Sequence, residues 1–490
     1  MTFLLVFRQA QYRHTSNSGV GTEAQFLDRF RSAGTALLPA DKKRYMGIYL
    51  KGQKIGFASS RFYPVRKKPT TEISNGEIDS YSVYEEIKMR LVISGTPQDI
   101  HSITKVSLSP DFKIRSFRFV MNAAHDITIE GKIQNKILLL DIETAGNKSR
   151  QEIQLDEIPQ MPLTVIPYLL REGLKNGMRV KFPVFDPTTL STQNMLVEIV
   201  GKEKILLDND EVDAFKIKGD LNGIPLMMWI DEQGNELKEE SPMGFTLIAE
   251  PMSEAMKLPV SSSEISDLIT QTAVPFNIEL PPDISYLKMR LRGADFEGFE
   301  LNGGRQTIRG SILKIVKEDI STPGYVSLPV SGMEQFLKES PFIQSKDPRI
   351  VNLANEIIDG EKSSLSAGRL LWAWVFKNIK KTPSITIPSA VDVLNTKKGD
   401  CNEHTALYTA LARSIGLPTR ISVGLVYKDR YFYYHAWPEI FVGRWVAIDP
   451  TLGQFPADAT HIRLISGDLD KQMMLLKVVN NISLEGIEYR

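Results

Sequence analysis

The chain has 490 residues, of which 42% are hydrophobic and 24% are charged. This length predicts roughly three domains, and this composition is typical of a globular protein. Fifty-nine basic residues balance fifty-nine acidic ones, so the charge does not indicate a nucleic acid or an anionic membrane as a partner. A single cysteine excludes an internal disulfide. The sequence has no run approaching about 20 apolar residues, so we expect no integral membrane span.

Residues 1–40 are predicted to form an N-terminal helix or terminus. Apolar residues recur at helical spacing in TEAQFLDRFRSAGTALLP. The first residues, MTFLLVFRQAQYR, lack the basic n-region, the long apolar core and the small-residue cleavage site of a signal peptide. Two interpretations stay open, namely an ordinary terminus or the end of a longer export signal or anchor that was lost to a late start codon.

Three β-rich segments are predicted after this terminus. Residues 41–155 alternate apolar and polar side chains in runs broken by Gly, Pro, Asp and Asn, which is the pattern of antiparallel strands. Residues 156–255 begin with a short helix, TVIPYLLREGL, and continue as a second β-rich domain. Residues 256–330 are predicted to form a small β linker domain. The run DNDEVD at 208–213 lacks the central glycine and the final glutamate of a calcium loop, so we interpret it as a solvated turn.

The last segment, 331–490, has helical periodicity at first and contains the only cysteine. Cys401 lies in KKGDCNEHTALYTALARSIGLPTR, where apolar residues recur at helical spacing until a glycine and a proline stop the helix. Asp400, followed three residues later by Glu403, is the pattern of an N-terminal capping box. The sequence therefore predicts a helix from about Cys401 to Ile415.

A cysteine in the first turn of a helix has two interpretations. The helix N-terminus offers unpaired N–H groups and about half a positive charge, which favours the reactive thiolate. The N–H of Cys401 itself can donate to an oxyanion. The alternative is a buried cysteine that packs as a small apolar residue. We interpret Cys401 as a nucleophile, because the apolar face of the helix begins after it.

The predicted base is His435, in the run YFYYHAWPEIFVGRWVAIDPT, which reads as two aromatic-rich strands around a turn at Gly443. A lone strand histidine is more often structural, but Asp449 ends the second strand. Asp449 shares a face with His435 only if the connection has an odd number of residues or a strand has a bulge, and we predict one of these. Two other histidines are weaker candidates: His404 on the cysteine's own helix, and His461 in a loop-like tail with no evident partner.

Three sequence blocks carry a family resemblance. In order, they are GDC heading a helix that ends in IGLPTR, then HAWPEI, then DPT. They strongly resemble the bacterial transglutaminase-like superfamily of papain-like cysteine enzymes, over about residues 331–470. The resemblance implies Cys401 as nucleophile, His435 as base and acid, and Asp449 as orienting carboxylate. Members usually supply a second oxyanion donor upstream of the cysteine, for which the candidates are Trp372, Trp374, Ser389 and Asn395.

The predicted fold class is multidomain, with antiparallel β-rich N-terminal domains followed by an α+β papain-like or transglutaminase-like domain. In that domain, the helix carrying the cysteine packs on an antiparallel sheet carrying the histidine and the aspartate. The predicted function is acyl transfer through a thioester. We favour hydrolysis of a peptide or amide bond, because water is always present. Two alternatives stay open: a protein-crosslinking transglutaminase, and a non-catalytic binding or scaffold protein with a relic site.

No cofactor and no metal site is predicted, since no pair of histidines has helical i, i+4 spacing with a glutamate. The expected partner is a protein or peptide substrate and not a nucleic acid, and the sequence leaves the oligomeric state open. The run GIYLKGQKIGF resembles the front part of bacterial envelope proteins that carry such a domain. This resemblance favours the bacterial periplasm or cell envelope, although the chain contains no complete signal peptide.

Overall fold

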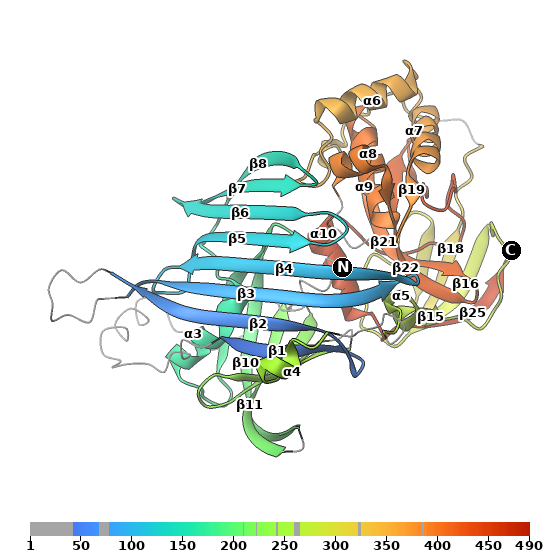
Figure 1. The fold of residues 1–490 in the computed structure, drawn as a ribbon. Helices are drawn as coiled ribbons and strands as arrows, with labels where there is room; N and C mark the ends of the chain where they lie inside the picture. The colour runs from blue at the N-terminus through green and yellow to red at the C-terminus, as the bar shows by residue number, and fades with distance from the viewer. Residues whose placement is uncertain are drawn as a thin grey trace, which may run out of the picture.

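A large sheet and a mixed helix-and-sheet region make up the protein (Figure 1). The predicted helix or terminus at 1–40 lies outside the described residues. The computed structural model describes residues 43–67, 78–208, 210–221, 223–241, 244–258, 265–321, 325–383, 387 and 389–490.

One antiparallel sheet of 14 strands fills the N-terminal half of the described chain. Buried and more exposed positions alternate along most of its strands, as in β3, because successive side chains of a strand point to opposite faces. The strands are β1 (Arg44–Leu50), β2 (Gln53–Arg66), β3 (Ile78–Ile93), β4 (Thr96–Leu108), β5 (Ile114–Asn122), β6 (Ile127–Gln134), β7 (Ile137–Thr144), β8 (Asn147–Gln154), β9 (Arg179–Asp186), β10 (Ser191–Leu207), β11 (Asp210–Leu221), β12 (Ile224–Ile230), β13 (Glu236–Glu240) and β14 (Phe245–Ala249).

The spatial order of this sheet runs from β8 back to β1 and then from β14 back to β9. The predicted boundary between 41–155 and 156–255 thus falls between the two outermost strands, while β1 pairs with β14 in the middle. The sheet bends back on itself, since Phe117 of β5 packs on Phe185 of β9 with 5.3 Å between ring centroids. The predicted short helix is present as α3, Val165–Glu172.

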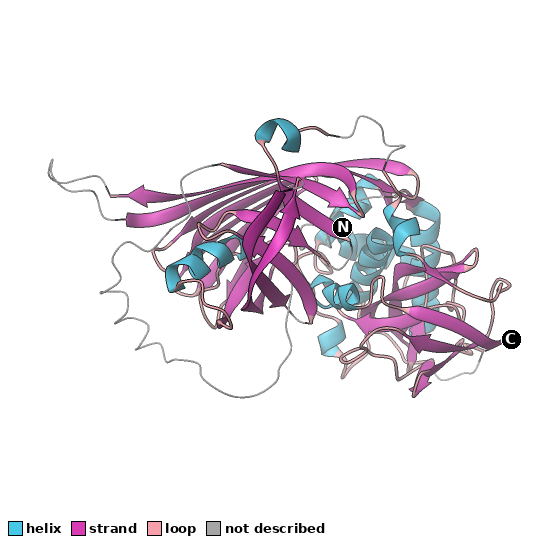
Figure 2. Cartoon of the chain, turned by 90° about the horizontal axis from the view of Figure 1, so that it is seen from below, coloured by secondary structure: helices cyan, strands magenta, loops and turns pink. Residues whose placement is uncertain are grey.

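The C-terminal region places helices on a five-stranded sheet of order β15-β22-β21-β24, with β23 paired to β22. Figure 2 shows these helices beside one end of the large sheet. The mixed architecture behind a β-rich N-terminal part confirms the predicted fold class. The elements are β15 (Val274–Pro275), α6 (Pro348–Ile358), α7 (Ser364–Asn378), α8 (Ala390–Thr396), α9 (Cys401–Ser414), β21 (Thr419–Lys428), β22 (Tyr431–Phe441), β23 (Trp445–Ala447) and β24 (Ile462–Ser466).

A four-stranded sheet of order β17-β18-β16-β25 adjoins this region. Its last strand comes from the end of the chain, so the sheet joins residues on both sides of the boundary predicted between 256–330 and 331–490. All the domain limits therefore stay predictions. The remaining elements are α4 (Met252–Ala255), α5 (Leu268–Thr272), β16 (Tyr286–Arg292), β17 (Gln306–Arg309), β18 (Ile312–Val316), β19 (Lys380–Lys381), β20 (Lys398–Gly399), α10 (Leu469–Gln472), β25 (Ser483–Tyr489), and 3-10 turns at Pro162–Thr164, Glu334–Phe336 and Met473–Lys477.

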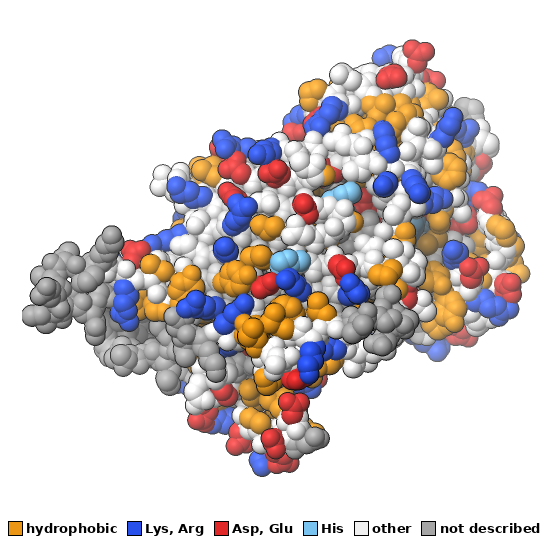
Figure 3. Space-filling view, viewed as in Figure 1, with side chains coloured by type: hydrophobic (Ala, Val, Ile, Leu, Met, Phe, Trp, Pro, Cys, Tyr) orange, Lys and Arg blue, Asp and Glu red, His pale blue; other side chains and the backbone are white. Residues whose placement is uncertain are grey.

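The large sheet contacts the helices through Asn147 at the start of β8. Its amide donates to Asp392 of α8 at 2.7 Å and accepts from Arg349 of α6 at 2.8 Å. On the face seen in Figure 3, acidic and basic side chains are interspersed. Within the described ranges, none of the helices has the length and apolar character needed to cross a membrane.

Candidate active site

The helix that carries the cysteine begins at Cys401, as the sequence predicts. The Asp400 carboxylate accepts the Asn402 N–H at 2.9 Å, and Glu403 accepts the Asp400 N–H at 2.8 Å, so the capping box is present. Burial raises the pKa of Asp400 well above its usual value, and the charge and hydrogen bond of Glu403 raise it further.

Cys401 is half-buried and faces the strand β22. The hydroxyl of Thr405, one turn further along α9, donates to the Ala436 carbonyl at 3.1 Å and holds the helix on that strand. Burial raises the pKa of the Cys401 thiol, and the charge of Asp400 adds to this. The charge of His435, its hydrogen bond to the sulfur, and a hydrogen bond from the backbone of Ala436 act in the opposite direction. The structure thus brings the predicted nucleophile and the predicted base together.

His435 is held by Asp449, whose Oδ2 lies 2.7 Å from His435 Nε2. The hairpin between them pairs Phe441 with Trp445, so the connection has three residues. The predicted odd-numbered loop is confirmed, and it puts Asp449 on the His435 side of the sheet. Burial alone would lower the pKa of His435, but the charges of Asp449 and Cys401 and hydrogen bonds to both raise it to about 9. With Nε2 on Asp449, Nδ1 is left for the thiol.

Asp449 is fully buried and surrounded by hydrogen-bond donors. Its Oδ1 accepts the backbone N–H groups of Thr451 at 2.7 Å and Leu452 at 2.8 Å. Burial by itself would raise the pKa of this carboxyl. The charges and hydrogen bonds of His435 and His461 outweigh burial and hold the pKa well below its usual range. The surroundings of Asp449 therefore favour its ionised form.

His461 is the member of this cluster that sequence reasoning missed. Its Nε2 lies 3.0 Å from Asp449 Oδ2, and its Nδ1 lies 3.2 Å from Asp458 Oδ1. The strand β21 explains the approach, because Gly424 pairs with His435 on one side and with Arg463 on the other. A Cβ at Gly424 would lie 1.9 Å from the Ile462 carbonyl oxygen. Only this tertiary contact brings His461 to the site, so no local sequence pattern predicts that His461 belongs to it.

The other candidates from the sequence each contact a different partner. His404 is buried and its Nδ1 donates to the Asp400 carbonyl at 2.6 Å. Trp372 donates its indole N–H to the Asp449 carbonyl at 3.0 Å. Ser389 accepts from the Gln344 amide at 3.1 Å, Asn395 donates to Asn147 at 3.3 Å, and Lys397 lies over the Trp374 ring at 4.3 Å.

The site residues His435, Asp449 and His461 offer potential metal-ligand atoms within 4.8 Å of one another. However, both imidazoles direct Nε2 to the same carboxylate oxygen at hydrogen-bond distance. A hydrogen bond to a carboxylate needs an N–H at that nitrogen, whereas a metal ligand needs the lone pair there. We therefore interpret the cluster as a hydrogen-bonded network, and a site without metal stays a prediction.

A mainly apolar cavity of about 320 Å³ lies beside the first turns of α9. Asn402, which directly follows the cysteine, and Thr405 line it from the helix. Ile153 lines it from β8 of the large sheet, Leu190 from the turn between β9 and β10, and Phe342 from the segment before α6. The cavity is therefore formed jointly by the N-terminal sheet and the helix of the candidate nucleophile.

Comparison with known proteins identifies a family for part of the C-terminal region. Residues 351–450 match the family model of the transglutaminase-like superfamily. The chain carries a transglutaminase-like domain. This domain contains Cys401, His435 and Asp449, so the match supports a cysteine-based enzyme in the coarse sense. Among curated proteins, none matches this sequence.

Two solved structures are similar to parts of the chain. One is a candidate cysteine protease from Cytophaga hutchinsonii, with 15% identity over 42% of this chain and 86% of that chain, and a TM-score of 0.26. The other is a candidate protease from Parabacteroides distasonis, with 11% identity over 74% of this chain and 65% of that chain, and a TM-score of 0.19. With scores this low, neither likeness adds to the assignment of the domain's chemistry.

Proposed function

We propose that this protein is a cysteine acyl-transfer enzyme that hydrolyses a peptide or amide bond in a protein or peptide substrate. Cys401 is the nucleophile, His435 the base and acid, and Asp449 the orienting carboxylate. The observation that supports this most directly is the placement of His435 between two partners. Its Nε2 lies 2.7 Å from a fully buried carboxylate, and its hydrogen bond to Cys401 and its charge favour the thiolate.

The first half-reaction forms a thioester. His435 takes the proton of the Cys401 thiol through Nδ1, and the sulfur forms a bond to the substrate carbonyl carbon. The tetrahedral oxyanion collapses, the C–N bond breaks, and the amine leaves with the proton that His435 returns. Asp449 keeps the ring in the tautomer and orientation that these proton transfers need. The N–H of Cys401, at the helix N-terminus, is the oxyanion donor that the chain itself supplies.

The second half-reaction releases the acyl group. His435 draws a proton from water, the hydroxide oxygen bonds to the thioester carbon, and the C–S bond breaks to give a carboxylic acid and the free thiol. An amine in place of water would give a crosslink instead. We favour water as the acceptor, because an amine can compete with water only at a site from which water is excluded.

The cavity beside α9 supports a substrate with an apolar side chain. It is mainly apolar, it starts at Asn402, and about 320 Å³ accommodates one large side chain. Because Ile153 of β8 and Leu190 of the β9–β10 turn line it, the N-terminal region takes part in substrate binding in this proposal. A peptide with an apolar residue close to the cleaved bond is therefore the expected substrate class.

The test uses the full chain and a peptide library made by digesting a proteome, in water enriched in ¹⁸O. Hydrolysis predicts new peptide termini by mass spectrometry, with ¹⁸O in the new carboxylate. Cys401→Ala is expected to abolish these products, while His101→Gln on β4 serves as a matched control that keeps them. Equal product formation by wild type and Cys401→Ala would overturn the proposal.

A second arm of this experiment separates the alternatives. A biotin-labelled primary amine is added together with a glutamine-containing protein. Amine incorporation with release of ammonia, and no ¹⁸O-labelled termini, would identify a crosslinking enzyme. A Cys401 that reacts with iodoacetamide no faster than a free thiol, with neither product formed, would identify a relic site.

A further inference from the structure

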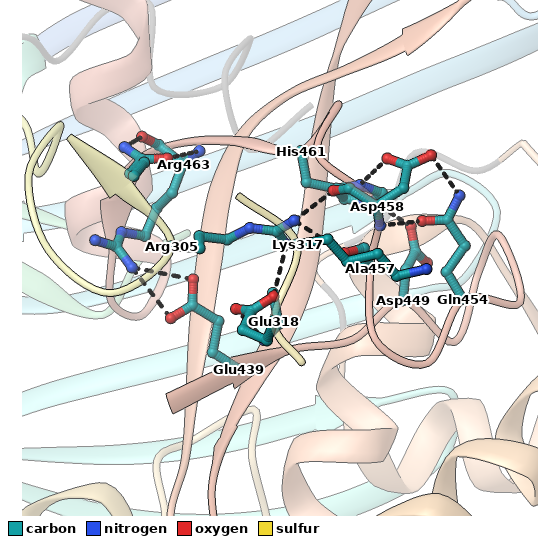
Figure 4. Close-up of polar contacts among 12 residues, drawn as sticks. Arg305, Lys317, Glu318, Glu439, Asp449, Gln454, Ala457, Asp458, His461 and Arg463 are labelled. Atoms are coloured by element: carbon teal, nitrogen blue, oxygen red, sulfur yellow. Dashed lines mark hydrogen bonds and ion pairs between the residues drawn. The ribbon is translucent and has the colours of Figure 1, made fainter. Parts of the chain in front are cut away.

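His461 lies between two carboxylates inside the protein (Figure 4). Its side chain is fully buried, and its two ring nitrogens point to different acidic groups: Nε2 to Asp449 Oδ2 at 3.0 Å, and Nδ1 to Asp458 Oδ1 at 3.2 Å. A neutral imidazole has one N–H and one lone pair. It could satisfy only one of these two contacts if both carboxylic groups were ionised.

The surroundings of Asp449 favour its ionised form. Its Oδ1 accepts the backbone N–H groups of Thr451 and Leu452, which can only donate. Its Oδ2 lies 2.7 Å from His435 Nε2 and 3.0 Å from His461 Nε2. Burial alone would raise the pKa of this carboxyl, but the charges and hydrogen bonds of both histidines hold it well below its usual range, so Asp449 is an acceptor toward both rings.

Asp458 has a similar environment. Its Oδ1 accepts the backbone N–H of Thr460 at 2.9 Å, and its Oδ2 accepts the Gln454 side-chain N–H at 3.0 Å. The orientation of that amide is set by its other end, since Gln454 Oε1 accepts the Asp458 N–H at 2.8 Å. Burial alone would raise the pKa of Asp458, but the hydrogen bonds and charge of His461 and the hydrogen bonds of Thr460 hold it well below its usual range. With an ionised carboxylate at each side, both ring nitrogens of His461 have an acceptor to which an N–H can donate.

From this geometry we propose that His461 is a permanent imidazolium and a positioning residue that, paired with Asp458, fixes Asp449 as the carboxylate that orients His435. This inference rests on the proposed function, because it assigns a role relative to that triad. Charges alternate along one line: Asp458 is negative, His461 positive and Asp449 negative, and His435 and Cys401 follow. Each charge has an opposite neighbour, which is the condition for burying charges without a large cost in stability.

Arg305, which directly precedes β17 of the four-stranded sheet, fixes the backbone beside Asp458. Its guanidinium donates to the Ala457 carbonyl at 2.9 Å and to the Asp458 carbonyl, and it pairs with Glu318 at 3.6 Å. The loop that carries Asp458 is thereby held in place by the segment before β17. The segment that enters the four-stranded sheet thus supports the site, although Arg305 lies far upstream of Cys401, His435 and Asp449 in the sequence.

The groups that face His461 determine how it acts on His435. These are Asp449 and Asp458, His435 with 6.0 Å between ring centroids, and Arg305 behind the Asp458 backbone. His404 of α9 interacts with the charge of Asp449, and burial lowers the pKa of His404. Burial alone would lower the pKa of His461, and both carboxylates raise it. The positive ring offsets part of the attraction that Asp449 exerts on the His435 proton, so it keeps the pKa of His435 from rising further.

The decisive measurement is the protonation of His461 in the full chain labelled with ¹⁵N-histidine. A histidine with an ordinary pKa of about 6.5 is mostly neutral at about pH 8. Both ring nitrogens of His461 are expected to show the ¹⁵N shifts of N–H groups at that pH. Loss of one signal set in His461→Gln assigns the resonance. If that variant does not fold, substitution of the other histidines assigns it by exclusion.

The same spectra test the positioning role through the titration of His435. His461→Gln removes a positive charge and leaves Asp458 uncompensated, so the His435 midpoint is expected to rise by about one pH unit. In the double variant His461→Gln/Asp458→Asn the pair is removed as a neutral unit, and the midpoint is expected to return toward that of wild type. His101→Gln, which changes a distant histidine, is expected to leave it unchanged.

Two results would overturn the inference. An unprotonated ring nitrogen on His461 at about pH 8 contradicts the imidazolium, whether a metal or a lone pair explains it. An unchanged His435 midpoint in a folded His461→Gln protein contradicts the positioning role. Neither measurement uses a substrate, so a failure of the proposed hydrolysis and a failure of this inference are separate outcomes.

Discussion

The indole N–H of Trp372 on α7 donates to the backbone carbonyl oxygen of Asp449 at 3.0 Å. The same ring packs against Phe455, which follows Asp449 in the chain, with 5.6 Å between centroids. The proposed orienting carboxylate is thus held at its side-chain oxygens by backbone N–H groups and histidines, and at its backbone by a tryptophan. This second support belongs to the helix that precedes the cysteine helix, so α7 contributes to the geometry without contacting the sulfur.

Trp372→Phe is expected to keep the packing and lose this hydrogen bond. The free energy of unfolding should fall by about 1 kcal/mol, the net value of one such bond. Expressed as an activation free energy, the loss of turnover should exceed the loss of unfolding free energy, because the Asp449 carboxylate loses its fixed position. Urea unfolding and single-turnover kinetics measure the two effects. Trp445→Phe, at the other end of the hairpin beside Phe441, is the matched control, and an equal loss of turnover there would remove the special role of Trp372.

Asp449→Asn is expected to lower the pKa of His435 from about 9, because the negative charge that favours the imidazolium is gone. The amide oxygen can still accept the Thr451 N–H, so the loop is expected to keep its shape. Turnover should fall by roughly three to four orders of magnitude, as expected when an imidazole loses its orienting carboxylate.

The ¹⁵N titration of His435 measures this shift, and near-ultraviolet circular dichroism checks the fold of the variant. Should the His435 midpoint stay near 9 in a folded Asp449→Asn protein, the charge of Asp449 would not be the cause of the raised pKa. In that case the remaining source of the shift would be Cys401, which Cys401→Ala would reveal.

Stability is expected to depend on pH through His435. Its pKa is about 9 in the folded protein and about 6.5 when unfolded. Between these values the folded state binds more protons, so the contribution is fully present below about pH 6.5, decreases as pH rises, and is lost above about 9. The slope is about 1.4 kcal/mol per pH unit for one proton, which gives on the order of 3 kcal/mol across the window.

Urea midpoints at several pH values between 6.5 and 9 measure this dependence. His435→Gln is expected to lose the part of the slope that belongs to one proton and to keep the part that belongs to His461, whose pKa is also raised. A wild-type protein whose midpoint stays constant or rises across this range would contradict the assignment.

The cavity beside α9 predicts a specificity effect. Ile153→Trp on β8 adds a large ring at its wall and is expected to lower kcat/KM severalfold for peptides with a large apolar residue at the cleaved bond. The iodoacetamide rate of Cys401 should not change, since the substitution leaves Cys401, His435 and Asp449 unaltered. Leu206→Trp, an exposed position on β10, is the matched control. A parallel loss for peptides with small side chains would show that the cavity does not hold the apolar residue.

Local signals in the sequence were sufficient for several parts of the site. The capping box of Asp400 and Glu403 and the start of the helix at Cys401 depend on side chains within four residues of one another. The position of Asp449 relative to His435 follows from the number of residues in one hairpin turn. Each of these features is set by backbone geometry over a short stretch, which is why a single sequence suffices to predict it.

Other parts of the site depend on contacts between segments that are distant in the chain. His461 reaches Asp449 only because β24 pairs with β21 across from β22. Arg305 reaches the Asp458 loop from more than 150 residues away. The candidates for a second oxyanion donor stay predictions, and Trp372, Ser389 and Asn395 form hydrogen bonds with partners that the sequence does not identify.

Three features can be derived from the amino-acid sequence alone: the order of the three motif blocks, the β-rich character of the first half, and the residues that could serve as nucleophile, base and carboxylate. These depend on residue type and on spacing within single helices and hairpins. The charges that surround Cys401, His435 and Asp449 are set by the tertiary structure, because burial and the pairing of β21 with β24 determine that Asp449 has two imidazole partners and that His461 has two carboxylates. The electrostatics of a buried site come from long-range packing, and no short run of residues contains that information.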